Sequence, residues 1–391
     1  MQGHIRKRTY TTKTGKHTVN WYVIVDLGRD HNGKRRQKWH GGFKTRKEAE
    51  VARTKIVGDL HDGTYTEPSK LMLREWVEDK WLPVVETQVK PSTFESYERN
   101  MRHHVLPKLG GRKLRDIGPA QLNDLYANLL ASGRRNGDGG LSAKTVRYIH
   151  TIIHKALSDA LDAGVVAANV AERAKPPRPR TRSATEIRFW TPDQLGTFLR
   201  IVDQHRLAVA WRVSAMTGMR RGEVLGLRWR DIDFDNARIH VRQAVVSVRY
   251  ELIFSTPKNH RARVVDIDLE TVEALRLHRK AQEAERDEWG KDYLDSDLVF
   301  CKENGEPLHP QTYSQAFERI VAKSDLPPIR LHDLRHTHAT IALRAGIPAK
   351  FISERLGHEN PAFTLKQYAH VIPGMQAEAA QAIAALVPNE S

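Results

Sequence analysis

The spacing of apolar residues changes twice along this chain, and each change marks a new part of the predicted fold. Residues 21–27, Trp-Tyr-Val-Ile-Val-Asp-Leu, are typical of a strand, and the Asn-Gly pair at 32–33 predicts a hairpin turn to a partner strand at 35–39. A helix is expected over residues 45–60. Residues 1–65 therefore predict a small α+β module with one sheet and one helix.

Residues 66–174 carry a helical period instead. Amphipathic segments begin near Trp76, Ser92, Pro119 and Ser142. A capping box from Ser92 to Glu95 predicts where the second of these helices starts. Ser142 is expected to cap the longest helix, and Gly164 to end it. Four amphipathic helices in succession predict an all-α domain.

Both periods occur between residues 185 and 391. The run Thr-Pro-Asp-Gln at 191–194 predicts a helix start, with an N-cap, a first-turn proline and a capping-box glutamine. The tail at 374–387 is apolar on one side, which predicts a last helix. Strands are expected at residues 238–246, 248–254, 263–267 and 298–300, and helices over most of the remainder. This part is predicted to be a mainly helical α+β domain, which makes the whole chain multidomain.

A stretch rich in proline and arginine precedes this last domain. Residues 175–184 begin Lys-Pro-Pro-Arg-Pro-Arg-Thr-Arg, and prolines keep such a segment extended. Its arginines can follow a phosphate backbone, whereas a nuclear-localisation tract is the alternative interpretation. We interpret the stretch as a basic linker that lets two domains close around a duplex.

The net charge of the chain indicates what kind of partner it binds. The 391-residue chain holds 63 Lys and Arg against 47 Asp and Glu, a net charge of +16 with a pI near 9.9. More than half of the excess lies in residues 1–65, where 15 basic residues against 6 acidic ones leave +9. A polyanionic partner is the simplest explanation, and a solvated basic face is the alternative for that first stretch.

The cysteine content and the hydropathy of the chain indicate in which cellular compartment the protein functions. Cys301 is the only cysteine, so the chain has no intramolecular disulfide and few ways to bind zinc. No run approaches the roughly 18 consecutive apolar residues of a membrane span, and residues 1–10 are too polar for a signal peptide. We expect a cytoplasmic protein without a membrane partner.

Three polar motifs interrupt the helical pattern near the C-terminus. In Leu-His-Asp-Leu-Arg-His at 331–336, His332 and Arg335 share one helical face and can present an imidazole and a guanidinium to one anion. Gly357 is expected to end the next helix and to place His358 just beyond it. Tyr368 follows about ten residues later. Taken alone, each motif is typical of a solvated helix face or of ordinary packing, but the combination is not.

Together these motifs resemble the C-terminal signature of the tyrosine recombinase (phage integrase) family. Residues 217–229, Thr-Gly-Met-Arg-Arg-Gly-Glu-Val-Leu-Gly-Leu-Arg-Trp, look like its first arginine box, with Arg220 in the catalytic place. Residues 255–265 look like its β-hairpin, with Lys258 as the catalytic lysine. The resemblance spans about residues 185–375 and fills six expected positions: Arg220, Lys258, His332, Arg335, His358 and Tyr368.

The resemblance implies DNA cleavage without a cofactor, by attack of Tyr368 on phosphorus to form a 3′-phosphotyrosine link. A free phenol has a pKa of about 10, so this tyrosine needs a base and a positive field. Arg220 and Arg335 are expected to stabilise the charged transition state. Lys258 is expected to protonate the leaving 5′ oxygen, and His332 to accept or relay the tyrosine proton.

Other polar residues near these six have expected roles of their own. His358 is expected to hydrogen-bond a phosphate oxygen, and Glu223 to orient the arginine one turn before it. The spacing of His332, His336 and His338 invites a metal site, because the first two are four residues apart on a helix. The Glu of the zincin pattern is missing and no cysteine lies nearby, so no metal is expected.

The resemblance extends upstream of the catalytic motifs. Residues 1–65 resemble the arm-binding domain of lambda-like integrases, and residues 66–174 resemble the core-binding domain that grips the crossover site. Residues 175–184 are then the linker, and residues 185–391 the catalytic domain with its tail helix. DNA contacts are expected from ten basic residues: Arg6, Lys7, Arg8, Lys34, Arg35, Arg36, Lys144, Arg147, Arg178 and Arg180.

The function implied is site-specific integration or excision of phage or mobile-element DNA. Two strand exchanges through a Holliday junction join double-stranded attachment sites within a homotetramer, with a host DNA-bending factor and an excision factor as further partners at the nucleoid. The C-terminal tail is expected to dock on a neighbouring protomer, and packing within its own domain is the alternative. Three other functions stay open: a Xer-like resolvase of chromosome dimers, a type IB topoisomerase-like relaxase, and a DNA-binding regulator without catalysis.

Overall fold

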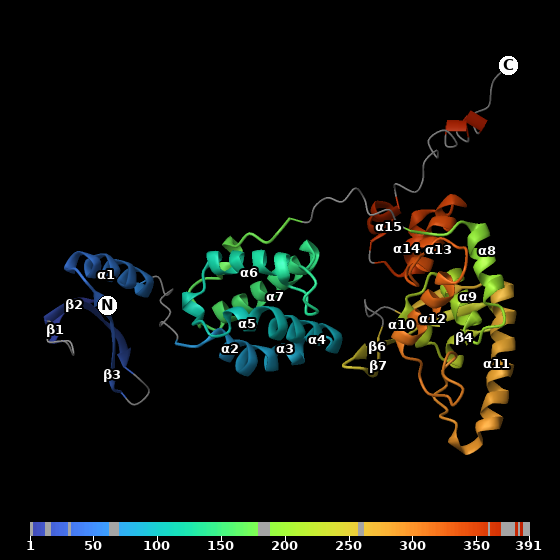
Figure 1. Ribbon diagram of the computed structural model, residues 1–391, viewed down its shortest axis with the longest axis horizontal. Coiled ribbons are helices and arrows are strands. Elements are labelled where there is room, and N and C mark those ends of the chain that lie inside the picture. The colour runs from blue at the N-terminus through green and yellow to red at the C-terminus, as the bar shows by residue number, and fades with distance from the viewer. Residues whose placement is uncertain are drawn as a thin grey trace. The chain divides into compact units, whose positions relative to one another are not determined.

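The chain folds into two compact units, Met1–Arg180 and Thr181–Ser391, whose elements are labelled in Figure 1, a view of the computed structural model. The division between the units falls inside the basic stretch at residues 175–184. The structure describes residues 3–11, 17–29, 33–61, 70–178, 188–256, 262–358, 360–368, 380, 381, 384 and 385.

The first unit begins with a three-stranded antiparallel sheet and one helix. Its elements are β1 (His4–Thr11), β2 (His17–Arg29), β3 (Arg35–Phe43) and α1 (Arg46–His61). Val23, Val25 and Ala49 are buried, so a small core lies between β2 and α1. The predicted strand pair and helix are confirmed. Strand β1 was missed, because Ile5 is its only aliphatic residue and no alternation marks it.

The second part of this unit is built of helices, as expected. They are α2 (Leu73–Glu75), α3 (Leu82–Gln88), α4 (Pro91–Asn100), α5 (Leu106–Leu109), α6 (Pro119–Ser132) and α7 (Ala143–Asp162), with π-helical turns η1 (Trp76–Trp81) and η2 (Met101–Val105) and 3₁₀ turns η3 (Leu114–Asp116) and η4 (Val170–Arg173). These helices share an apolar core of their own, with Trp81 and Tyr126 among its fully buried side chains.

The helix ends in this part test the predicted caps. Ser142 caps α7, because its hydroxyl accepts a hydrogen bond from the Thr145 N–H at 3.1 Å, and Gly164 follows the helix with a φ of 68°. The start predicted at Ser92 is wrong, because α4 already begins at Pro91, with Lys90 as its N-cap. Proline suits the first helical position, since its φ is preset and its missing N–H has no partner there anyway.

The second unit combines helices with two small antiparallel sheets, β4-β5-β8 and β6-β7. Its elements are α8 (Pro192–Ile201), α9 (Ala208–Thr217), α10 (Arg221–Leu225), η5 (Trp229–Asp231), β4 (Ile232–Asp233), β5 (Arg238–Val241), β6 (Ala244–Val248), β7 (Glu251–Ser255), β8 (Arg263–Asp266), α11 (Leu269–Trp289), η6 (Gly290–Asp292), α12 (Pro310–Ala322), α13 (Asp333–Arg344), α14 (Ala349–Leu356) and α15 (Pro361–Tyr368).

The strands of this unit correct the predicted ones. Residues 238–246, predicted as one strand, form parts of two strands in different sheets: β5 pairs with β8, whereas β6 pairs with β7. Between them, Gln243 stands where the alternation of Ile239, Val241 and Val245 calls for an apolar residue, and its side chain donates to the Gly226 carbonyl at 2.6 Å. Residues 298–300, predicted as a strand, contribute an isolated bridge instead.

An aromatic cluster forms the centre of the second unit. Phe198 lies 5.0 Å from Trp190 and 5.1 Å from Phe317 between ring centroids, and all three side chains are fully buried. Helix α13 packs on α9 beside this cluster, and α14 packs on α13 (Figure 1). The segment that follows α9 is therefore held next to the helix that carries Arg335. Within the described residues, no helix is both long and apolar enough to cross a lipid bilayer.

Candidate active site

Arg220 lies at the turn between α9 and α10. Gly218 ends α9 in the left-handed conformation, with a φ of 64°, so that the chain can reverse before the next helix starts. Arg220 is the N-cap of α10, and its backbone N–H donates to Glu223 Oε2 at 2.8 Å. Its side chain donates to Glu223 Oε1 at 2.9 Å and to the Gly357 carbonyl at 3.1 Å.

Glu223 is the buried anion of this site. Its side chain is 1 % exposed and accepts hydrogen bonds from Arg263 at 3.0 and 2.7 Å, besides those from Arg220. Burial raises the pKa of Glu223, but the hydrogen bonds and charge of Arg263, followed by those of Arg220, outweigh burial and lower the pKa to about 2. Glu223 therefore stays ionised and fixes both guanidinium groups, as its predicted orienting role requires.

Arg335 projects from α13 into the protein and is 4 % exposed. Its guanidinium donates to the Gly218 carbonyl and to the Leu356 carbonyl, each at 2.7 Å. Burial, and then the charge of Arg220, lower the pKa of Arg335 to about 9, which leaves it cationic at neutral pH. The two arginines thus meet at the end of α14, where they bind neighbouring carbonyls.

The end of α14 has the predicted left-handed cap. Gly357 has a φ of 67°, and His358 follows it directly. The His358 Nδ1 atom lies 2.7 Å from the Thr364 hydroxyl of α15. Burial, and then the charges of Arg335 and Arg220, lower the pKa of His358 to about 4, so its imidazole is neutral at neutral pH.

Tyr368 ends α15 and is 1 % exposed. Its hydroxyl lies 2.7 Å from Nδ1 of His336, a residue to which sequence analysis gave no role beyond the discarded metal site. Burial raises the pKa of Tyr368 to about 12, although the charge of Arg335 acts in the opposite direction. The sequence did offer a reason to consider His336 as a site residue: it directly follows Arg335 and lies one helical turn after His332.

The other two histidines of α13 differ in setting. His332 is the N-cap of the helix and has an exposed side chain, yet desolvation by neighbouring groups and then the charge of Arg335 lower its pKa. His338 is structural: its Nδ1 bonds the Ala215 carbonyl at 2.9 Å, and its Nε2 accepts from Arg355 at 3.1 Å. Among the described residues, no group of three His, Cys, Asp or Glu side chains is arranged to hold a metal ion.

Lys258, the sixth predicted catalytic residue, lies outside the described residues, between the end of β7 and the start of β8. Arg263, which opens β8, was not among the predicted site residues, yet its guanidinium reaches the centre of the site. Besides Glu223, it donates to the Arg355 carbonyl at 3.0 Å.

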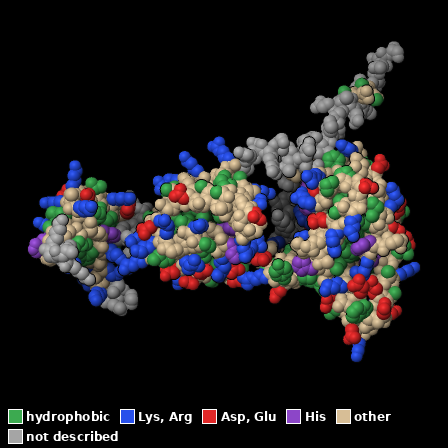
Figure 2. Space-filling model, viewed as in Figure 1, with side chains coloured by type: hydrophobic (Ala, Val, Ile, Leu, Met, Phe, Trp, Pro, Cys, Tyr) green, Lys and Arg blue, Asp and Glu red, His purple; other side chains and the backbone are tan. Residues whose placement is uncertain are grey.

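The basic residues predicted to contact DNA are exposed where the structure describes them. Arg6 and Arg8 lie over the Trp39 ring, with guanidinium carbons 5.6 and 5.0 Å from the ring centroid. Arg35 is 67 % exposed and pairs with Asp26 at 2.5 Å. Five more are exposed, namely Lys7, Lys34, Arg36, Lys144 and Arg147, as is Arg178 near the end of the first unit, whereas Arg180 lies outside the described residues. Figure 2 shows Lys and Arg side chains on the visible face of both units.

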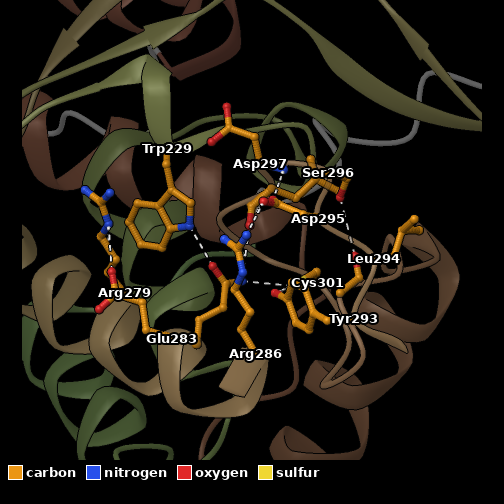
Figure 3. A pocket seen from close by; sticks show the side chains of 13 residues that line it. Trp229, Arg279, Glu283, Arg286, Tyr293, Leu294, Asp295, Ser296, Asp297 and Cys301 are labelled. Carbon is orange, nitrogen blue, oxygen red and sulfur yellow. Dashed lines mark hydrogen bonds and ion pairs between the residues drawn. The ribbon is translucent and has the colours of Figure 1, made fainter. Parts of the chain in front are cut away.

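A separate cavity of about 200 Å³ lies between α11 and the loop that follows it. Figure 3 shows its lining, in which Arg286 pairs with Asp295 at 2.8 Å and the Trp229 indole N–H donates to Gln282 at 2.6 Å. The buried Cys301 thiol accepts from Gln282 at 2.9 Å, and burial raises its pKa. These lining groups bond one another, and none belongs to the six predicted residues, so we assign the cavity no catalytic role.

Family models match three consecutive parts of the chain. The model described as phage integrase family matches residues 188–374, the one described as arm DNA-binding domain matches residues 8–58, and the one described as phage integrase, N-terminal SAM-like domain matches residues 73–130. The chain belongs to the phage integrase family. Members of this family are tyrosine recombinases, as the sequence motifs indicated.

A known tyrosine recombinase and a known integrase resemble the chain over much of its length. A XerC-like tyrosine recombinase of Caldanaerobacter subterraneus subsp. tengcongensis is 29 % identical over 395 residues, which cover 96 % of this chain and 98 % of that protein. The ICEBs1 integrase of Bacillus subtilis is 27 % identical over 303 residues, which cover 77 % of this chain and 79 % of that protein.

Two solved integrase structures share the fold. The Tn1549 transposon integrase in complex with transposon right end DNA has a TM-score of 0.64 at 22 % identity, over 80 % of this chain and 99 % of that one. A lambda integrase dimer bound to a core site has a TM-score of 0.56 at 18 % identity, over 92 % of this chain and 93 % of that one. The predicted fold class, a small sheet module, a helical region and an α+β domain, is confirmed.

Proposed function

We propose that this integrase-family chain is a site-specific DNA recombinase that cuts and rejoins DNA through Tyr368. One observation carries the proposal: Arg220 and Arg335 meet at the end of α14, on the Gly357 and Leu356 carbonyls, and Tyr368 lies in the same buried cluster as Leu356. Cleavage of a phosphodiester needs a nucleophile and a positive field. The Tyr368 phenol supplies the first, and the two guanidinium groups supply the second.

The proposed reaction exchanges one phosphoester bond for another. The Tyr368 oxygen attacks phosphorus, the bond to the 5′ oxygen breaks, and a 3′-phosphotyrosine bond forms. Lys258 is proposed to donate the proton that the leaving 5′ oxygen takes up. A 5′ hydroxyl from a second duplex then attacks the phosphotyrosine and frees the tyrosine, so a strand is exchanged without consumption of a nucleotide.

The tyrosine proton and the phosphate oxygens need separate partners. We assign the proton to His332, at the start of α13, because that histidine is exposed and can pass a proton to solvent. His358 is assigned to a phosphate oxygen, as a neutral imidazole donor. The contact between Tyr368 and His336 belongs to the protein without DNA.

Double-stranded attachment sites are the proposed substrates, and a homotetramer is the proposed assembly. Lambda integrase structures that resemble this chain hold a dimer bound to a core site and a tetramer bound to a Holliday junction. We propose arm-site binding by residues 1–65, core-site binding by residues 66–174, a linker at residues 175–184 and catalysis by residues 185–391. A host DNA-bending factor and an excision factor are proposed as further partners, in a cytoplasmic, nucleoid-associated complex.

A suicide-substrate assay tests the chemistry. The full chain is incubated, without metal or nucleotide, with nicked duplexes that carry candidate junction sequences from its own genomic neighbourhood. A covalent protein–DNA adduct that Tyr368→Phe abolishes, while salt-sensitive DNA binding persists, is the expected result. DNA binding without an adduct on any candidate would favour the regulator instead, and adducts in Tyr368→Phe would assign the nucleophile elsewhere.

The proposed role of the tail concerns assembly. Most residues after Tyr368 lie outside the described residues, so the evidence is the apolar pattern at 374–387. A chain that ends at Pro373 is expected to fold and to bind one site, yet to form fewer tetramers on paired sites. Native electrophoresis of the DNA complexes measures this, and unchanged tetramers would rule out docking between protomers.

Resolution of chromosome dimers is the second candidate function, because the XerC-like relative covers 96 % of this chain. That match extends over most of residues 1–65, so the N-terminal module does not by itself separate an integrase from a Xer-like resolvase. Recombination assays separate the two functions. An integrase joins two attachment sites of different sequence, whereas a resolvase recombines two copies of one site.

A further inference from the structure

We propose that His336 is a latch for the nucleophile: without DNA, its Nδ1 atom accepts the hydrogen bond of the Tyr368 hydroxyl and holds that side chain buried. The contact distance is 2.7 Å, and the ring centroids lie 5.7 Å apart at an angle of 61°. His336 is thus a positioning residue that acts through Tyr368. The proposal rests on Tyr368 being the nucleophile of the proposed reaction.

The packing around Tyr368 explains why a latch is possible. The ring lies in a small apolar cluster with Ala339 and Leu343 of α13 and with Ile352 and Leu356 of α14. Its side chain is 1 % exposed, so a phosphodiester cannot approach the hydroxyl while the ring stays there. Attack therefore requires Tyr368 to leave this cluster, and the bond to His336 opposes that movement.

The protonation states allow His336 to be the acceptor in this contact. Burial, and then the neighbouring His332, lower the pKa of His336 to about 4, although the Asp333 carboxylate acts in the opposite direction. Burial also raises the pKa of Tyr368 to about 12. Both groups are neutral at pH 7, so the phenol keeps its proton, and we assign the imidazole the tautomer with its proton on Nε2, in which Nδ1 accepts the phenolic O–H. This contact protects the phenol rather than ionising it.

Arrival of DNA gives a reason for release. Arg335 is the residue before His336 on α13, and its charge already lowers the pKa of Tyr368. A phosphate bound at Arg335 brings acceptor oxygens that compete with Nδ1 of His336 for the Tyr368 O–H. Exchange of the imidazole for the phosphate as acceptor breaks the latch, and α15 is free to carry the tyrosine toward phosphorus.

Nitration of the full chain without DNA tests the latch, with tetranitromethane as the probe and peptide mass spectrometry as the readout. The chain contains its own references: Tyr250 is 90 % exposed, and Tyr313 is fully buried. In the wild type we expect Tyr368 to be nitrated far more slowly than Tyr250. Nitration of Tyr313 reports unfolding, so each variant is scored only if Tyr313 stays protected.

Three substitutions separate a hydrogen bond from simple packing. His336→Asn keeps an acceptor where Nδ1 was, so protection of Tyr368 should stay within about twofold of the wild type. His336→Leu removes the acceptor and His336→Gln moves it outward, and each should raise nitration of Tyr368 about fivefold, the effect of losing one hydrogen bond of ordinary net strength. If the Leu variant unfolds, the Gln variant decides.

Two results would overturn the latch. One is Tyr368 nitration that does not rise in the Leu or Gln variant while Tyr313 stays protected. The other comes from the pH profile of adduct formation: a lost low-pH limb in His336→Asn would make His336 a proton acceptor in the reaction. Because nitration needs no DNA, failure of the latch and failure of the proposed recombination are told apart.

Discussion

Arg263 holds both carboxylate oxygens of Glu223, with Nη1 to Oε1 at 3.0 Å and Nη2 to Oε2 at 2.7 Å. The side chains are 11 % and 1 % exposed, so the pair is almost fully removed from water. The same carboxylate binds the side chain and the backbone N–H of Arg220. One buried anion therefore compensates two cations and joins β8 to the turn before α10.

Replacement of this anion should destabilise the second unit. Glu223→Gln leaves two guanidinium groups without a counter-charge, and the loss of one member of a buried pair typically costs about 3–5 kcal/mol. For a unit of this size we expect the thermal midpoint to fall by roughly 6–20 °C. Asp266→Asn is the matched control, since its pair with Arg238 is exposed on both sides. A control shift as large as that of Glu223→Gln would contradict the argument.

The low pKa of Glu223 predicts that the second unit loses folding stability at acid pH. The pKa of Glu223 is about 2 in the folded protein against an ordinary 4.5, so its contribution is fully present above about pH 5. It is lost as the pH falls toward 2, by roughly 3 kcal/mol in all. Thermal midpoints measured from pH 7 to pH 3 should fall more steeply in the wild type than in Glu223→Gln. Parallel curves would show that the ionisation of Glu223 is not linked to folding.

Features of the site that depend on one residue type at one local position could be predicted from the sequence. Gly357 was expected to cap α14 because glycine adopts a positive φ at no steric cost, and its φ is 67°. The predicted arginines converge because each is fixed by a local turn, Arg220 as N-cap and Arg335 on the buried face of α13. These positions follow from short-range backbone rules.

Features that depend on packing between distant segments could not be predicted. Whether His332 or His336 meets Tyr368 depends on how α15 lies against α13, which no periodicity within either helix encodes. Arg263 was predicted only as part of a strand, and its partner Glu223 lies 40 residues earlier in the chain. Strand β1 lacked an alternating pattern because its partner strand β2, and not its own apolar residues, holds it in the sheet.

Gly218 should tolerate no side chain. A Cβ at this position would lie 2.5 Å from Leu356 Cδ2 and 2.9 Å from His338 Cδ2, and its φ is 64°. Gly218→Ala therefore combines backbone strain of about 1 kcal/mol with a clash that pushes α14 away from α9. Gly346 has a φ of 78° and open space around it, so Gly346→Ala introduces the backbone strain without a clash. Thermal unfolding should show the larger loss for Gly218→Ala, and equal losses would exclude a steric cause.

The change at Gly218 should also reach catalysis. Its carbonyl accepts one of the two hydrogen bonds that orient Arg335. We therefore expect Gly218→Ala to slow adduct formation on a nicked duplex at a temperature where the variant is still folded, and Gly346→Ala to leave the rate within about twofold. A folded Gly218→Ala variant with the wild-type rate would show that this carbonyl is not needed to position the guanidinium.

Arg335→Lys tests whether the shape of the cation matters as well as its charge. The Arg335 fork binds two carbonyls at once, on Gly218 and Leu356, and still presents N–H groups for a phosphate. A lysine ammonium cannot hold both carbonyls and neutralise the transition state, so adduct formation should slow about 100-fold, the usual effect of removing one preorganised donor. Arg344→Lys on the same helix is the control, because Arg344 is exposed and lies over the Phe189 ring. If Arg335→Lys keeps a rate within tenfold of the control, a point charge suffices and the fork geometry is not what stabilises the transition state.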